Sequence, residues 1–102
     1  MQTVVVLFNL KPGVVRAEYE AWARSSDLPV VNGLASVDRF EVLKASGLLI
    51  GEGDSPYEYA ELIRVQDMDA FFKDLGDPAA QAGAAQFQQY ADKPVFILTQ
   101  SL

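Results

Sequence analysis

The order of strand-like and helix-like segments constrains this chain of 102 residues more than any other feature. Strand composition covers 3–10, 36–45, 57–65 and 95–100, and helical spacing covers 14–25, 67–75 and 77–92. The order is therefore β-α-β-β-α-β, with the second helical region divided at Asp77-Pro78, a typical helix start. It predicts an α+β, ferredoxin-like fold over residues 1–102, with helices on one face of a four-stranded antiparallel sheet.

The strand at 3–10 is apolar on both faces except at Asn9, so we expect it to be central. About one hundred residues do not suffice to cover both faces of such a sheet. A homodimer that packs sheet against sheet is therefore predicted. The apolar run at 48–50 is open to two interpretations, a strand extension or a loop that covers another part of the molecule.

Side-chain spacing predicts which faces are buried. On the first helix Tyr19 and Trp22 share the apolar stripe, and we expect Pro29 to end the helix. The next helix should begin at the N-cap Asp67 and should bury Met68, Phe71, Phe72 and Leu75. The helix after it carries a small-residue face that either allows close packing or leaves room for a ligand.

Composition excludes several functions. The net charge of −6 argues against nucleic acids and anionic membranes as partners. Without cysteine or histidine, the chain has no disulfide, thiolate nucleophile, imidazole base or His/Cys metal ligand. The acidic turn at 51–54 matches neither a phosphate loop nor an EF-hand. We expect a flexible hairpin or lid and no metal there, and the alternative is a weak site for a hard cation. Neither a signal peptide nor an apolar run of about 20 residues is found, so a cytoplasmic location is expected.

Several short motifs resemble a known superfamily in their order and spacing. They are Tyr19-x-x-Trp22, Asp27-x-Pro29, Phe71-Phe72 and Phe87-x-x-Tyr90 before a closing strand. Together they resemble the dimeric α/β-barrel superfamily. Within it, residues 18–29, 36–40, 57–59 and 93–98 are most similar to the REDY-like group whose named member is HapK.

The resemblance implies a homodimer in which each protomer holds a ligand cavity between sheet and helices. It also implies a role in the biosynthesis of pyrrole or indole pigments, prodiginines in particular. The chemistry implied is condensation or ring closure of an aromatic heterocycle. EthD-like relatives are more distant, and they usually carry histidine in a His-x-Pro motif where this chain has Asp27-Leu28-Pro29. Chemistry at that position would therefore fall to a carboxylate.

Three residues are the catalytic candidates. Asp27 lies at the predicted end of the first helix, where the negative end of the helix dipole would raise its pKa; the alternative is a surface Asp that caps the next turn. Glu61 shares a strand face with Tyr57 and Tyr59, and a buried Glu is either an acid–base group or part of an ion pair with Arg39 or Arg64. Asn9 offers an amide that polarises a carbonyl, or it bonds the adjacent turn.

The expected substrate-binding residues are mainly aromatic. Flat side chains hold a flat ring, but helical spacing alone requires only that Tyr19 and Trp22 be buried. Arg39 is the one charged member of the set. The full set is Trp22, Tyr19, Tyr57, Tyr59 and Arg39.

These features favour a small cofactor-independent enzyme that binds a small aromatic molecule and uses acid–base chemistry. Two alternatives remain open. A non-catalytic carrier would shield a reactive intermediate in the same cavity. A cofactor-free monooxygenase would oxidise an electron-rich aromatic ring, because such enzymes of this superfamily often have an Asn in the first strand.

Overall fold

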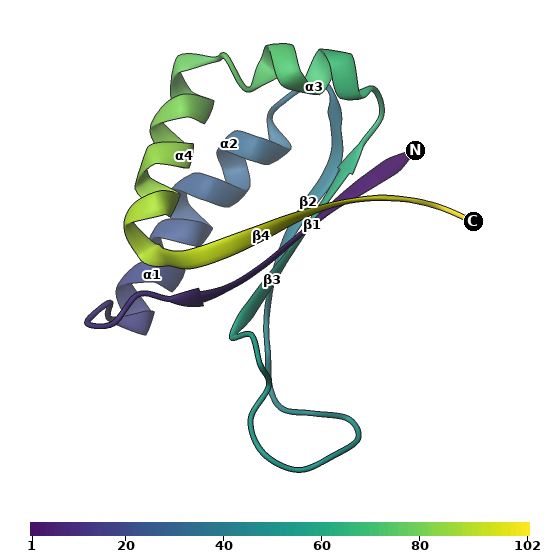
Figure 1. Cartoon of the computed structure of the whole chain (residues 1–102). Helices are drawn as coiled ribbons and strands as arrows, with labels where there is room; N and C mark the ends of the chain where they lie inside the picture. Colours follow the sequence, from purple (N-terminus) through teal and green to yellow (C-terminus); the bar gives the residue numbers. More distant parts are fainter.

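The computed structural model describes residues 1–102 and has the predicted α+β, ferredoxin-like architecture. Its antiparallel sheet has the strand order β2-β3-β1-β4, and Figure 1 shows the helices gathered on one side of it. The strands are β1 (Gln2–Leu10), β2 (Val37–Lys44), β3 (Tyr59–Val65) and β4 (Ala91–Gln100). β1 is central, as predicted, because it pairs with both β3 and β4.

The first helical region continues past Pro29, so the predicted stop there is wrong. α1 (Arg16–Trp22) runs into a π-helical turn, η1 (Ala23–Asp27), and then into α2 (Leu28–Asn32). In this turn the Leu28 N–H donates to the Ala23 carbonyl, one residue further back than in an α-helix. The wider turn accommodates a proline, which has no N–H to donate, without breaking the helix.

Two capped helices follow β3, as predicted. α3 (Met68–Asp74) begins where Asp67 Oδ1 accepts from the Asp69 N–H at 2.9 Å. α4 (Pro78–Tyr90) begins where Asp77 Oδ2 accepts from two backbone N–H groups. The predicted stripe of α3 is wrong at Phe72 and Leu75, which are 63% and 39% exposed, because only Phe71 of this short helix is buried and Met68 is half-buried.

The core lies between the helices and one face of the sheet, here termed the covered face. Val4, Val6 and Phe8 of β1 are buried there, together with alternate residues of β3. The opposite side, termed the open face, has no helix over it (Figure 1). It presents Val5, Leu7, Ala60, Leu62 and Ile97 in neighbouring register.

The segment 45–58 between β2 and β3, termed the arm, projects beyond the sheet and away from the helices (Figure 1). Its apolar run neither extends a strand nor covers another part of the chain, since Leu49 is 99% and Ile50 87% exposed. Three arm glycines have positive φ, among them Gly51 at 101°, a conformation that side chains disfavour.

Two strand boundaries differ from prediction. β3 begins at Tyr59, because Ser55 and Tyr57 form a hydrogen-bonded turn ahead of it. β4 begins at Ala91 and includes Pro94, which an edge strand tolerates. Lys93, with φ 46°, lies where the β1–β4 register shifts. None of the helices combines the length and the apolar character that a membrane crossing requires.

Candidate functional site

A cavity of about 130 Å³ lies between α2, α4 and the covered face. Its walls are mostly apolar, and its two ionisable residues are Asp27 and Glu61; we term it the carboxyl cavity. Ala80, Gly83 and Ala84 provide the α4 wall, so the small-residue face of this helix adjoins the cavity. The remaining lining residues are Val30, Val31, Leu34, Phe40, Ile63, Leu75, Phe87, Gln88 and Phe96.

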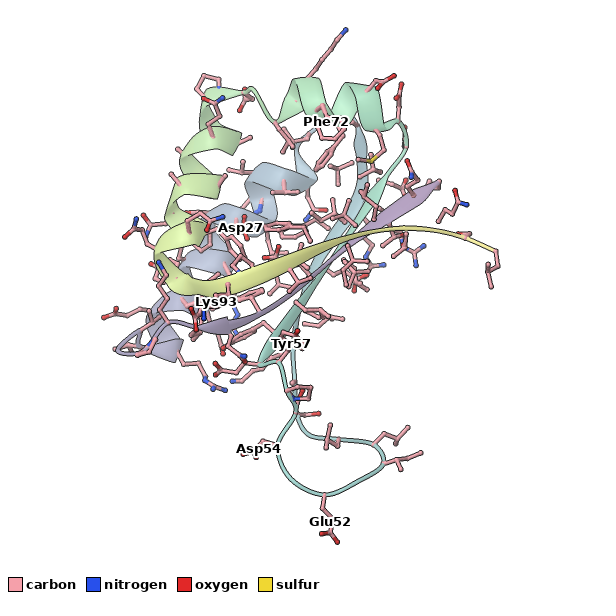
Figure 2. The ribbon with its side chains drawn as sticks, in the orientation of Figure 1. Asp27, Glu52, Asp54, Tyr57, Phe72 and Lys93 are labelled. Carbon is pink, nitrogen blue, oxygen red and sulfur yellow. The ribbon has the colours of Figure 1, made fainter.

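Asp27 owes its position to the π-helical turn. It is the last residue of η1 and is 8% exposed, and Figure 2 shows it on the helix side of the sheet. Burial raises its pKa from the usual 3.8 to about 6, with no hydrogen bond or opposite charge to offset this cause. The expected direction of the shift is therefore present. The expected cause is wrong, because the helix continues past Asp27 and does not end there.

Glu61 owes its position to the alternation of β3. Tyr59, Glu61 and Ile63 face the core, and Glu61 is 5% exposed. Burial raises the pKa of Glu61 to about 8, and the nearby charge of Asp27 adds to the effect. Its Oε2 has no hydrogen-bond partner. Arg39 is not its partner, since it pairs with Glu41 at 3.2 Å on the exposed side of β2.

Tyr19 adjoins the carboxyl pair from α1. Its side chain is fully buried, and its hydroxyl has no hydrogen-bond partner. Burial, followed by the charges of Glu61 and Asp27, raises the pKa of Tyr19 well above its usual range. The phenol therefore stays protonated. Tyr19 does not line the carboxyl cavity, and it faces a separate hollow together with Glu20, Lys44 and Tyr59.

Two further aromatic candidates do not line the carboxyl cavity. The Tyr59 ring stacks on Phe8 with centroids 5.5 Å apart, and its hydroxyl donates to Glu20 Oε2 at 2.7 Å. Tyr59 therefore faces a separate hollow beside Glu20 and Lys44. Trp22 is half-buried against Tyr90 and lines a shallow hollow between the first helical region and α4.

Asn9 and Tyr57 lie at the arm. Asn9 Nδ2 donates to the Pro56 carbonyl at 3.1 Å, and its Oδ1 accepts from the Glu58 N–H at 2.8 Å. Glu58 in turn accepts from the Leu10 N–H and pairs with Arg16. Figure 2 shows Tyr57 where the arm leaves the sheet. Asn9 thus fastens the arm, and the structure brings neither residue to the carboxyl cavity.

Sequence reasoning missed the other walls of the cavity. Phe40, Phe87 and Phe96 line it from β2, α4 and β4, and Gln88 adds an amide. Phe40 is held in place because its backbone N–H donates to Asn32 Oδ1 at 2.9 Å while its carbonyl accepts from Asn32 Nδ2. One signal in the sequence could have indicated these walls. The small residues of α4 leave space, and the large aromatic residues of β2 and β4 lie on the strands opposite.

The sequence matches the REDY-like protein HapK family over residues 2–102. The chain belongs to this family. No match was found among curated proteins.

Solved structures give the same fold. HapK from Hahella chejuensis is 25% identical with a TM-score of 0.79, and the match covers 100% of this chain and 93% of that one. A cofactor-independent oxygenase, SnoaB from Streptomyces nogalater, is 21% identical with a TM-score of 0.73, over 98% and 91% of the two chains. A dimeric ferredoxin-like protein of unknown function from Thermobifida fusca is 18% identical with a TM-score of 0.75, over 98% and 90%.

Proposed function

We propose that this protein is a cofactor-independent enzyme of secondary metabolism that condenses or cyclises an aromatic heterocycle in the carboxyl cavity. The observation that carries the proposal is the pairing of Asp27 and Glu61 in one apolar cavity, with pKa values of about 6 and about 8. Two carboxyls whose pKa values are separated by their surroundings can act as base and acid near neutral pH. Membership in the HapK family supports pigment-type substrates.

The pair can serve both halves of a condensation. Near pH 7 Asp27 is ionised and Glu61 is protonated. In the addition half, Asp27 accepts a proton from the attacking atom, which bonds to a carbonyl carbon, while Glu61 donates a proton to the carbonyl oxygen. In the dehydration half, protonated Asp27 donates to the departing hydroxyl and Glu61 accepts the second proton. Water leaves, and both carboxyls return to their starting states.

A coloured condensation tests this proposal. Pyrrole-2-carbaldehyde and 2,4-dimethylpyrrole condense with loss of water to a dipyrromethene, whose visible absorbance reports the rate. Replacing either catalytic carboxyl, by Asp27→Asn or Glu61→Gln, should lower the protein-dependent rate by about 10²–10⁴-fold. The matched controls Asp54→Asn and Glu52→Gln make the same chemical changes on the exposed arm (Figure 2) and should leave the rate unchanged.

Other results would select other functions. Tight binding of a heterocycle without turnover, unaffected by Asp27→Asn or Glu61→Gln, would replace the enzyme by a carrier. Oxygen consumption with an added hydroquinone would indicate a cofactor-free monooxygenase. The side chain that suggested the monooxygenase, Asn9, is hydrogen bonded at the arm.

The assembly that fits this function is a homodimer through the open face. Several aliphatic residues of β1, β3 and β4 lie there in register with no helix over them. Burying them against a second copy removes apolar surface from water at about 25 cal/mol per Å². The Thermobifida fusca relative is described as dimeric, which supports the same arrangement here.

A further inference from the structure

The carboxyl cavity contains acidic side chains but no basic ones. Its ionisable lining residues are Asp27 and Glu61, and no Lys or Arg lines it. α2, α4, β2 and β4 contribute apolar residues and the uncharged Gln88. The titratable groups that face the pair are each other and the Tyr19 hydroxyl from α1.

Three glutamates elsewhere in the molecule, Glu20, Glu41 and Glu58, do have cationic partners. Glu20 accepts from the Tyr59 hydroxyl and pairs with Lys44 at 3.0 Å, and Glu58 pairs with Arg16. None of the ion pairs includes Asp27 or Glu61. The buried Glu61 Oε2 has no hydrogen-bond donor at all. The cavity therefore holds a buried acceptor, Glu61 Oε2, to which no group of this chain donates, and the neighbouring Tyr19 hydroxyl is also without a partner.

Physical chemistry narrows what can fill such a space. A buried carboxylate is costly without a cation or N–H donor, whereas a bound anion would add repulsion. Aromatic walls at Phe40, Phe87 and Phe96 would also favour a cation over their ring faces. The volume of about 130 Å³ is close to that of an apolar cavity of about 150 Å³ that holds benzene, so the cavity encloses one ring of a condensing pair.

We propose that the carboxyl cavity selects a ring ligand that carries positive charge on nitrogen, such as a protonated amine, an iminium or a protonated nitrogen heterocycle, and that it rejects anions. This inference rests on the proposed function and specifies the charge of its substrate. It also implies that binding a cation releases protons, because the cation favours the ionised form of the pair.

Three probes of one shape test the inference. Benzylamine is a cation, benzyl alcohol is neutral and benzoate is an anion, and calorimetry in buffers of different ionisation enthalpy measures both affinity and proton release. We expect benzylamine to bind about tenfold or more tightly than benzyl alcohol. The ratio of the benzylamine affinity to the benzyl alcohol affinity should increase from pH 5 to pH 8, and binding of benzylamine should release protons. Benzoate should not bind.

Variants assign any preference to the cavity. Asp27→Asn combined with Glu61→Gln should abolish the preference for the amine while keeping the alcohol, and Glu52→Gln should change neither. Ala84→Trp fills the cavity from α4 and should prevent all binding, with circular dichroism as the check on folding. A preference for benzylamine that persists in the double variant would overturn the inference, because groups outside the carboxyl pair would then recognise its positive charge.

The outcomes separate this inference from the proposed function. Equal binding of amine and alcohol, both blocked by Ala84→Trp, overturns charge selection and leaves a ring-binding acid–base cavity in place. Binding of none of the three probes, or binding that Ala84→Trp does not affect, overturns both, since each requires the cavity to hold a ring.

Discussion

The two faces of the sheet differ in an unexpected way. The covered face buries ionisable side chains, whereas the open face presents aliphatic side chains. On β3, Glu61 points into the covered face while its neighbour Leu62 lies on the open face. Buried charged residues without partners are rare, and large exposed apolar patches usually mark interfaces. One strand thus places an acid inside and an aliphatic residue outside. Selection for folding alone would favour the reverse, so each face reflects a requirement beyond stability.

The largest expected effect concerns the acid on the covered face. Because burial raises the pKa of Glu61 from 4.5 to about 8, the folded state binds more protons than the unfolded state in this window. Stability should therefore fall as the pH rises from about 4.5 through 8, by up to about 5 kcal/mol. Asp27 contributes in the same direction up to about pH 6. Urea unfolding of wild type and Glu61→Gln across pH 5–9 measures the effect.

The Glu61→Gln variant should lose most of this pH dependence and should be more stable than wild type near pH 9. Glu52→Gln on the arm is the matched control and should follow the wild-type curve. Parallel curves for wild type and Glu61→Gln would mean that Glu61 reaches water in solution.

The next effect tests the apolar part of the covered face. Phe8 is fully buried, and its ring contacts Tyr19, Tyr59 and Phe87 at centroid distances of 4.9–5.8 Å. Phe8→Ala should lower the free energy of unfolding by about 3–5 kcal/mol, measured by denaturant titration. Phe72→Ala removes the same atoms from an exposed site and should cost far less. Similar losses in both variants would contradict the assignment of the core.

A third test addresses the open face. Leu62→Glu places a charge at its centre, opposite Val5. We expect the dimer dissociation constant, measured by analytical ultracentrifugation, to rise about a hundredfold, because an apolar contact becomes a buried charge. Phe72→Glu, on the helix side, should leave it unchanged. A Leu62→Glu variant that associates as wild type does would locate the interface elsewhere.

The smallest effect concerns the arm. Asn9→Ala removes the two side-chain hydrogen bonds that fasten the arm to β1, at 3.1 and 2.8 Å. The loss should be about 1–2 kcal/mol, with faster hydrogen exchange at the Glu58 amide. Condensation rates should not change, because Asn9 lies outside the carboxyl cavity. A loss of condensation rate as large as that caused by Asp27→Asn would indicate that Asn9 takes part in catalysis.

Prediction from sequence succeeded where the signal is local. Alternating burial on β3 follows directly from its residues, and the caps Asp67 and Asp77 lie at the helix starts because their side chains accept nearby N–H groups. The prediction that the first helix ends at Pro29 was wrong, because the helical region continues to Asn32. Local rules do not anticipate a π turn, whose hydrogen bond from Leu28 to Ala23 reaches one residue further back than an α-helical bond.

For the candidate site, residue type and position suggested Asp27 and Glu61 as acids but not that they share a cavity. They lie on a helical turn and on a strand, and their proximity depends on how α2 packs over the sheet. The same packing placed Tyr59 and Trp22 at separate hollows and Asn9 at the arm.

By itself, then, the sequence determined the strand and helix order, the alternating faces and the lack of His and Cys chemistry, because composition and short-range periodicity determine these properties. The tertiary structure decided the register, the π turn that turns Asp27 inward and the burial that raises the pKa values of both carboxyls. Desolvation depends on every group packed around a side chain, and those groups come from distant parts of the chain.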